Sequence, residues 1–580
     1  MNISYILSKK INKALFIVTK LSIDFELKVH PSKRDEYGDY QVDGIMKIAK
    51  NIGFSSLELA KRIVSVLDLK DISSNINVIS PGFINIFLNP KWLSKNLIKI
   101  LHSSRLGIAF STENKNIVVD YSSPNIAKEM HVGHMRSTII GDTFVRISEF
   151  LGYCVIRSNH VGDWGTQFGM LIAYLQDMKI DSNNISISEL GIYYSIARKK
   201  YNSDLSFFNK AHNCVVKLQN GDNDCRVIWK NLICLSIMEN QKIYDLLNIT
   251  LNKINYMGES MYNYMLPDIV KDLKNKGLAF NDHGAVIVYL DNINKDKVKF
   301  TGVIIRKKDG SYLYSSTDIA AVKYRCEIFK ANRIVYYVDF RQCQHLIKIW
   351  EISRRAGYIS NGVLLEHHVF GMVLGKDGKP FKTRSGKIIK LVDLLNESIK
   401  RAKKLILKKN IQISKNLLEK LAKKIGIGAI KYYELSKNRT INYVFDWNKV
   451  LDFNGNTSLY IQYAYTRIFS LLEKYYKKYS FKYLILSKIK LETKHEIKLA
   501  IHLLKFEEVI LLVYRRGFPN LLCSYLYDLS VLFSVFYENF PIIFAKTEEL
   551  RTTRILLLIL ISKTLEIGLN LLGIEIVHKM

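Results

Sequence analysis

The chain has few cysteines, and they are not arranged for a metal or for disulfides. Seven occur among 580 residues. They stand at positions 154, 214, 225, 234, 326, 343 and 523, and no two have C-x-x-C spacing. An odd number without that spacing argues against a zinc module and against a disulfide framework. We therefore expect reduced thiols and no protein-bound structural metal.

Long hydrophobic runs are also lacking. Residues 1–20 alternate Ile, Leu and Val with Lys, without the unbroken apolar region and small-residue cleavage site of a signal peptide. The longest late apolar run, at 555–561, is far too short to cross a bilayer and fits a buried helix. These absences predict a cytoplasmic protein without a membrane partner.

Acidic residues are scarce relative to basic ones. The chain has 85 Lys and Arg against 53 Asp and Glu, a formal net charge of +32. Such an excess favours a polyanionic partner, and nucleic acid is favoured over an anionic membrane. Because single cores stop growing at ~250–300 residues, a chain of this length is expected to form roughly four domains.

Local patterns suggest where these domains lie. Residues 1–112 contain a helical stretch at 41–50 and a strand-like run at 83–88, which predicts a small α/β domain. Residues 113–400 alternate apolar strand-like runs with helical periodicity, which predicts a doubly wound parallel sheet. A polar helical stretch at about 183–290 separates the two halves of this sheet and is interpreted as an insertion.

The rest of the chain is predicted to be helical. Residues 401–455 are expected to form a linker, and residues 456–580 a helical bundle. The amphipathic segments that support this are 417–433, 459–476, 496–515, 520–539 and 551–572.

The motif His131-Val132-Gly133-His134 carries the most functional information. It follows a strand-like run at 117–119 and opens a helical stretch that continues to about Gly152. Ligands bind open α/β folds at such strand-to-helix turns, where the helix N-terminus offers free N–H groups to phosphate. Both imidazoles can face one phosphoryl group, and the glycine would let an adenine ring pack on the backbone. Two surface histidines or a metal pair are the alternatives.

The surrounding sequence extends this motif over two long stretches. Residues 120–142 and 159–169 resemble the class I aminoacyl-tRNA synthetases and, among them, the arginyl-tRNA synthetases. The resemblance covers nearly the whole chain, because it continues through residues 314–318, 341–345, 371–386 and 460–467.

The resemblance implies a fold and an activity. The fold would be a Rossmann-type catalytic domain between an N-terminal domain that contacts the tRNA elbow and a C-terminal bundle that binds the anticodon. The activity would be that of an arginine–tRNA ligase, which uses ATP with Mg²⁺ to convert L-arginine to arginyl-adenylate. The arginyl group then passes to the 3′-terminal adenosine of tRNA(Arg). Family members usually need bound tRNA before they form the adenylate, and we expect a monomer.

The catalytic residues follow from the same resemblance. His131 and His134 would stabilise the α-phosphate, with Gly133 beside the nucleotide. Further charge is expected from the basic segment 375–386, which has glycines for bending and occupies the place of the family's KMSKS loop.

Three cations of that loop are candidate ATP contacts: Lys379, Lys382 and Arg384. The second lysine of the KMSKS pattern is replaced by threonine, and the resemblance assigns the missing charge to Lys128. For at least one of the loop cations, a solvated surface position is the alternative.

Recognition of arginine requires a buried carboxylate, because a guanidinium presents a planar fork of donors. Asp318 is the best candidate, since it follows Tyr314 by four residues and would point the same way on a helix. The Asp-Gly pair at 309–310 predicts a hairpin turn that leads the strand delivering Tyr314. An N-cap or a salt bridge is the alternative for Asp318.

The resemblance adds further arginine contacts. Gln342 would join Tyr314 and Asp318 at the guanidinium. Asn125 and Ser123 would hold the α-carboxylate and amino end of arginine. Two more acidic positions of the pocket are matched by Asp120 and Glu259.

Tyrosines interleave with basic residues in the C-terminal segment. Unpaired anticodon bases can stack on such rings while cations hold the backbone, and Tyr463 and Arg467 are the candidate tRNA contacts. Aromatic residues at helical spacing are more often part of a core, which is the alternative.

Other functions stay open at this point. One is a class I ligase for another amino acid, and another is a non-catalytic tRNA-binding protein with a synthetase fold, which the altered loop would fit. A cytidylyltransferase-like nucleotidyl transferase shares the HxGH chemistry, but it would not need a basic, aromatic bundle.

Overall fold

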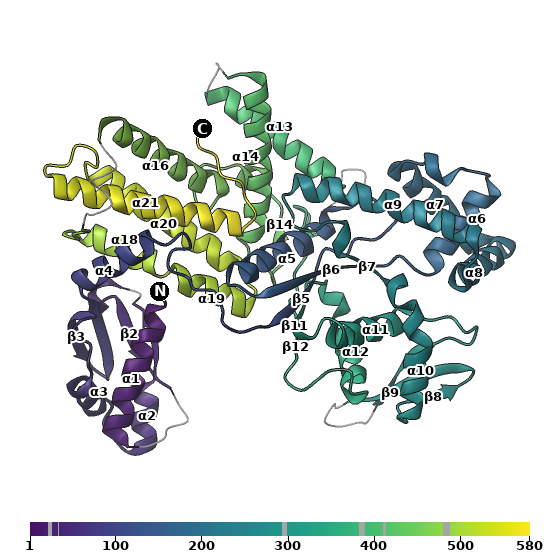
Figure 1. Cartoon of the computed structure of the whole chain (residues 1–580), viewed down its shortest axis with the longest axis horizontal. Coiled ribbons are helices and arrows are strands. Elements are labelled where there is room, and N and C mark those ends of the chain that lie inside the picture. Colours follow the sequence, from purple (N-terminus) through teal and green to yellow (C-terminus); the bar gives the residue numbers. More distant parts are fainter. Residues whose placement is uncertain are drawn as a thin grey trace.

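The computed structural model describes residues 1–20, 26–32, 34–292, 299–381, 389–409, 413–479 and 488–579. A parallel sheet lies at the centre, with the N-terminal domain and the C-terminal bundle to its left and a helical insertion to its right (Figure 1). The domain boundaries at about 112, 400 and 455 stay predictions.

The N-terminal domain is a four-stranded antiparallel sheet with helices. Its strands are β1 (Lys28–Pro31), β2 (Tyr40–Asp43), β3 (Ser73–Ile79) and β4 (Phe83–Leu88), in the order β1-β2-β4-β3. Its helices are α1 (Ile3–Thr19), α2 (Ile45–Ile52), α3 (Ser56–Val66) and α4 (Pro90–Leu101). Five apolar residues of the alternating N-terminal segment are buried on one face of α1: Ile3, Leu7, Ile11, Ala14 and Leu15. The strand expected at 83–88 is confirmed.

One prediction in this domain is wrong at its start. The helix expected from residue 41 begins at Ile45, because residues 40–43 form β2, which lies between β1 and β4 and pairs with both strands. Gly44 separates the two elements with a left-handed φ of 102°, a conformation that glycine adopts without steric cost.

The central sheet confirms the doubly wound arrangement. Its strands are β5 (Asn116–Asp120), β6 (Cys154–Val161), β7 (Tyr256–Gly258), β11 (Ala331–Tyr336) and β12 (Leu364–His367), in the order β12-β11-β5-β6-β7. All neighbouring strands of this sheet are parallel. The chain leaves β5 in one direction toward β6 and later returns to β11 on the other side. Ligands bind at the carboxyl ends of strands at such a switch point.

Helix α5 (Val132–Phe150) follows β5 and lies beside the sheet (Figure 1). It confirms the helix expected from the HVGH motif. Most of it is buried, since it packs on the sheet and on C-terminal helices. The start of α5 is therefore held rigidly at the sheet edge.

The insertion is helical over only part of its expected range. Helices α7 (Ile187–Ser203), α8 (Leu205–Asn220) and α9 (Asn223–Leu246) pack with α6 (Thr166–Asp177). Beyond them, the prediction of helix up to 290 is wrong. The chain forms β7 of the central sheet, α10 (Leu266–Asn275), and β8 (Ala279–Asp282) and β9 (Ala285–Asn292) of a second sheet. In β9, Val286, Val288 and Leu290 are buried, and this spacing of two is that of a strand.

The Asp-Gly turn is confirmed, but the strand after it is not. Strand β10 (Lys299–Arg306) leads into a turn in which Lys307 N–H donates to the carbonyl of Ser311 at 2.9 Å, with Gly310 at a φ of 82°. Tyr314 then begins helix α11 (Tyr314–Glu327). Helix α12 (Cys343–Arg355) follows β11.

The C-terminal part is helical as expected. Its helices are α13 (Leu391–Lys409), α14 (Lys415–Leu435), α15 (Trp447–Val450), α16 (Ser458–Lys478), α18 (Lys494–Leu504), α19 (Phe506–Arg516), α20 (Asn520–Asn539) and α21 (Glu548–Leu571). Two details differ: β14 (Tyr443–Val444) pairs with β13 (Val373–Leu374), and the expected helix at 496–515 is two helices that meet at Lys505. By length and composition α20 alone among the described helices could cross a membrane, and its apolar face lies in the bundle core.

Candidate functional site

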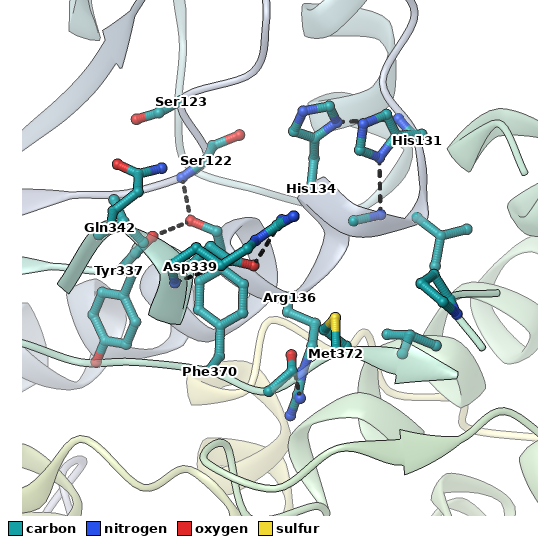
Figure 2. Close-up of a pocket in the computed structure, with 18 of the residues that line it drawn as sticks. Ser122, Ser123, His131, His134, Arg136, Tyr337, Asp339, Gln342, Phe370 and Met372 are labelled. Atoms are coloured by element: carbon teal, nitrogen blue, oxygen red, sulfur yellow. Dashed lines mark hydrogen bonds and ion pairs between the residues drawn. The ribbon is translucent and has the colours of Figure 1, made fainter. Parts of the chain in front are cut away.

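A cavity of about 460 Å³ opens at the carboxyl ends of β5 and β11 (Figure 2). Four segments line it: the loop after β5, the start of α5, the loop after β11 and residues 370–381. Six predicted site residues are among its lining: Ser123, Asn125, His131, Gly133, His134 and Gln342. The sequence therefore located the cavity correctly.

The two histidines lie with their rings stacked at its rim. Their ring centroids are 3.9 Å apart, and Figure 2 shows the two rings beside each other. His131 is the N-cap of α5, and its Nδ1 accepts from Gly133 N–H at 3.1 Å. His134 Nδ1 accepts from the backbone N–H of His131, also at 3.1 Å. This reciprocal capping box, rather than helical spacing alone, brings the imidazoles together.

These hydrogen bonds fix the chemistry of both rings. Since each Nδ1 accepts a backbone proton, each neutral ring carries its own proton on Nε2. Burial lowers the pKa of His134 to about 3, and burial together with the Lys128 ammonium lowers the pKa of His131. Both rings are thus neutral donors near pH 7, suited to hydrogen bonding an oxyanion without a mobile charge.

The structure gives a further reason for Gly133, and the packing of adenine against it stays a prediction. A Cβ at this position would lie 2.8 Å from Cε1 of His131. The glycine therefore makes room first for the capping histidine ring.

The helix N-terminus is less available than expected. The N–H groups of its first three residues already bond to the Ile389 carbonyl, to His131 Nδ1 and to the His131 carbonyl. The prediction that free N–H groups of α5 receive phosphate is therefore wrong for this conformation, and the histidine side chains are the exposed donors.

A buried arginine anchors the start of α5. Arg136 donates from Nε to Glu434 at 2.6 Å and from Nη1 to the carbonyl oxygens of Gly371 and Ile441 at 2.8 and 3.0 Å. Tyr443 donates to the second oxygen of Glu434 at 2.6 Å. Arg136 is 1% exposed and Glu434 is fully buried, so this pair fixes the helix that carries the histidines to α14.

The Asp120 carboxylate already has hydrogen-bond donors within the protein. Its carboxylate accepts from Arg325 at 2.6 Å and from Ser123 Oγ at 3.1 Å. Because both charges of the ion pair are buried, Asp120 is placed to orient Ser123 more than to receive a substrate.

Asp318 lies in a cluster of titratable groups outside the cavity lining. His345 Nε2 lies 2.5 Å from one of its oxygens, and His160 Nε2 lies 3.4 Å from the other. These histidines hold the pKa of Asp318 below its usual range, although burial alone would raise it. In turn, Asp318 raises the pKa of His160 against the effect of burial. The carboxylate is ionised and half-buried, as a guanidinium site requires.

Glu259 belongs to the same cluster but differs in charge. It starts the short helix η4 (Glu259–Met265), and burial, with the nearby Asp318 and Asp163, raises its pKa to about 7. Tyr314 is 63% exposed, and its ring packs edge-on against His345 at 5.0 Å. The structure thus brings together the predicted Asp318, Tyr314 and Glu259.

The predicted cations are only partly described. Lys128 lies over the Tyr194 ring of α7, with Nζ 4.2 Å from its centroid, and is close enough to affect both histidines. Lys379 is exposed on a turn at 375–379. Lys382 and Arg384 lie outside the described residues.

The predicted tRNA contacts lie on α16. Tyr463 is 45% exposed, and Arg467 Nη1 donates to its hydroxyl at 3.2 Å. The Arg467 guanidinium also lies 4.3 Å from the centre of the Tyr537 ring. By contrast, the neighbouring Tyr465 and Tyr475 are buried, so the core alternative holds for those two.

Within the described part of the chain, no three His, Cys, Asp or Glu side chains converge on a metal position. Three residues that shape the site were not predicted from the sequence. Arg136 and His345 lie within the stretches that resemble the family, but no role was predicted for them. Arg325 lies outside those stretches. The partners of Arg136 and Arg325 lie 298 and 205 residues away, so only folding pairs them.

Comparison with known families covers nearly the whole chain. Residues 96–447 match the catalytic domain of class I tRNA synthetases (R), residues 461–580 match the DALR anticodon binding domain, and residues 1–88 match the arginyl tRNA synthetase N terminal domain.

Curated relatives agree over their full length. An arginine–tRNA ligase of Blochmanniella pennsylvanica is 52% identical over 584 residues, and one of Sodalis glossinidius is 51% identical over 581 residues, each with 100% of both chains covered. Among solved structures, the arginyl-tRNA synthetase of Plasmodium falciparum is 30% identical, with a TM-score of 0.85 and coverage of 100% of this chain and 99% of that one. The Thermus thermophilus arginyl-tRNA synthetase, at 22% identity and a TM-score of 0.83 with both chains fully covered, supports the fold.

Proposed function

The chain belongs to the class I arginyl-tRNA synthetases and is an arginine–tRNA ligase, and on that premise we propose which of its residues carry the reaction. The ATP phosphates lie in the cavity at the switch point, with the α-phosphate facing His131 and His134. One observation carries this assignment: two stacked, neutral imidazoles fixed as Nε2 donors at the cavity rim.

The protein takes little part in the covalent chemistry of this reaction. The arginine carboxylate attacks the α-phosphorus, the bond to pyrophosphate breaks, and the leaving group takes the electron pair. Negative charge builds on the α-phosphate oxygens, where the two Nε2–H groups donate. Lys128 adds a positive charge beside them, and Lys379, Lys382 and Arg384 neutralise pyrophosphate. Positioning and electrostatics supply most of the rate enhancement.

Arginine extends from the cavity to the acidic cluster of Asp318 and Glu259. Ser123 and Asn125 hold its amino and carboxylate end, while Asp318, Tyr314 and Gln342 receive the guanidinium. His345 contacts the Asp318 carboxylate at 2.5 Å and gives way to the guanidinium when arginine binds. Glu259 provides a second carboxylate, and Asp120 acts by orienting Ser123.

Substrates and surroundings complete the proposal. ATP would bind as its Mg²⁺ complex, and the cation would offset the negative charge of the phosphates. The tRNA elbow meets the N-terminal domain, and the anticodon stacks near Tyr463 and Arg467 of α16. We propose a cytoplasmic monomer without a membrane partner, supported by α1 packed within its domain, by seven free thiols and by the buried apolar face of α20.

The test is aminoacylation of tRNA with each of the twenty amino acids, run beside arginine-dependent pyrophosphate exchange with and without tRNA. We expect charging by arginine alone and exchange only when tRNA is present. The D318N variant should raise the KM for arginine by about tenfold to a hundredfold, because it loses a charged hydrogen bond.

Two results would contradict this assignment. Unchanged arginine kinetics in D318N would remove Asp318 from the guanidinium site. Pyrophosphate exchange at full rate without tRNA would show that the arginine pocket is complete in the protein without bound tRNA.

A further inference from the structure

The loop between β5 and α5 follows an unusual backbone path. Three residues other than glycine are left-handed: Ser122, Ser123 and Ala127, with φ of 69°, 43° and 63°. Such residues persist only where surrounding contacts determine the conformation. The loop carries Ser123 and Lys128 of the proposed function and ends at the histidine pair, so whatever holds it also sets the site.

Helix α9 of the insertion supplies those contacts. Tyr244 and Ser236 are eight residues apart, about two turns, and lie on the same face. The Ser236 hydroxyl accepts from the N–H of Ala127 at 3.1 Å. The Tyr244 hydroxyl lies 2.8 Å from Ser122 Oγ. Each left-handed stretch of the loop therefore has one partner on α9.

A closed network continues from Tyr244 to the arginine side of the site. Asn159 on β6 donates from Nδ2 to the Tyr244 hydroxyl at 3.1 Å and accepts from Ser123 N–H on Oδ1 at 3.0 Å. Ser122 Oγ also accepts from Thr138 of α5 at 2.8 Å. The phenol thus joins the insertion, the loop and the histidine helix in one set of hydrogen bonds.

Burial makes these bonds hard to replace. Tyr244 is 3% exposed and Ser236 is 1% exposed, so water cannot easily substitute for either hydroxyl. The insertion also contacts the other end of the loop, since Tyr194 on α7 holds Lys128. Figure 1 shows α9 running from the outer part of the insertion to the central sheet.

We propose that Tyr244 and Ser236 of α9 are positioning residues of the ligation reaction, which hold the 121–130 loop in its left-handed path and thereby place Ser123 and Lys128. This inference rests on the proposed function, in which Ser123 holds arginine. It makes α9 a determinant of arginine binding, although neither side chain lines the cavity.

The experiment measures aminoacylation by full-length Y244F and S236A. We expect the KM for arginine to rise roughly three- to tenfold, the loss of one buried hydrogen bond, and the KM for tRNA(Arg) to stay unchanged. If the two residues had only a structural role, the variants would have a lower active fraction, but the KM for arginine would not rise relative to the KM for tRNA(Arg).

Matched controls come from the C-terminal bundle. Tyr525 is a buried tyrosine whose hydroxyl donates to the His502 carbonyl at 3.0 Å. Ser530 is fully buried and donates to the carbonyl four residues earlier at 2.8 Å, as Ser236 does. Y525F and S530A should match the thermal shifts of the two test variants and leave the arginine KM alone.

A double variant separates this inference from the function on which it rests. Because Tyr244 acts through Ser123, S123A/Y244F should have the arginine KM of S123A alone. If S123A itself leaves that KM unchanged, the proposed role of Ser123 fails. If S123A raises it while Y244F and S236A behave like their controls, the positioning role of α9 is overturned.

Discussion

The carboxyl groups of Asp318 and Glu259 lie in one cluster but lose their protons at different pH. Histidines hold the pKa of Asp318 low, whereas burial raises that of Glu259 to about 7. Asp318 therefore remains an anion across the physiological range. Glu259 is half protonated near neutrality, and a bound guanidinium would favour its ionised form.

This difference predicts a pH-dependent affinity for arginine. Below pH 7 Glu259 must release a proton when arginine binds, so the wild-type KM for arginine should rise as pH falls. Between pH 8 and 6 it should rise about tenfold more than that of E259Q, which has no such proton. His160, whose pKa is raised by Asp318 against the effect of burial, is present in both proteins.

Steady-state kinetics at pH 6, 7 and 8 would measure how steeply the KM for arginine changes with pH in the wild type and in E259Q. E351Q on the exposed face of α12, where Glu351 pairs with Arg355, is the control and should follow the wild type. Equal slopes in E259Q and the wild type would place Glu259 outside the guanidinium site.

Sequence could predict the site residues that lie within continuous motifs. The position of the histidine pair followed from the strand-to-helix turn, and Ser123 and Asn125 followed from the family resemblance of the same short stretch; all four line the cavity. The occupation of Asp120 by Arg325 could not be predicted, since a buried ion pair depends on two segments meeting in space. The same holds for His345 on Asp318.

Close packing of helices in the insertion depends on one glycine. A Cβ on Gly169 of α6 would overlap the Ala211 carbonyl and a methyl group of Val215 on α8. Since one of these neighbours is backbone, the two helices would have to separate. Gly191 of α7 is a helical glycine with nothing near its missing Cβ.

These two glycines should respond oppositely to alanine. G169A is expected to destabilise the insertion by about 1–3 kcal/mol through overpacking. G191A should stabilise it by about 0.5–1 kcal/mol, because alanine loses less backbone entropy in a helix. Urea unfolding followed by the fluorescence of Trp164 and Trp229, which pack together at 5.4 Å, would measure both. Similar effects from the two variants would contradict the packing argument.

Element types were predictable where the hydrophobic period was clear. The helices of the bundle and the parallel strands β5 and β11 followed from their patterns. The helical prediction for residues 183–290 is wrong at 285–290, where the alternation of apolar residues is that of a strand and directly follows a long polar helical segment. The division of residues 496–515 into two helices has no marker such as glycine or proline at Lys505.

The units of the molecule are joined by contacts between distant segments. The N-terminal ammonium of Met1 pairs with Glu507 of α19 at 2.8 Å, and Lys563 of α21 donates to the Leu101 carbonyl at 3.0 Å. A third junction is fully buried. Lys431 of α14 donates to the Leu247 carbonyl after α9 at 2.7 Å and to the Gly573 carbonyl after α21 at 2.8 Å.

Lys431 thus connects the insertion, the linker helix and the C-terminal bundle through one ammonium. Burial lowers its pKa to about 7, against the opposing effect of the Asp142 carboxylate. The lysine of an unfolded chain keeps its proton to about pH 10.4. Between these values the unfolded state binds more protons, so this group adds stability as pH rises from 7 and adds none below it.

Removing the Lys431 side chain should therefore cost more at alkaline pH. K431M leaves two buried carbonyls without their donor, a loss of about 1–3 kcal/mol, and the gap to the wild type should widen by about 1 kcal/mol for each pH unit from 7 to 9. K424M is the matched control. Lys424 lies two turns earlier on α14 and forms an exposed pair with Glu575 at 3.1 Å, which is worth about 0–1 kcal/mol. Urea unfolding at pH 7, 8 and 9 measures the gap, and a constant gap for K431M would mean that Lys431 keeps its proton in the folded chain throughout this range.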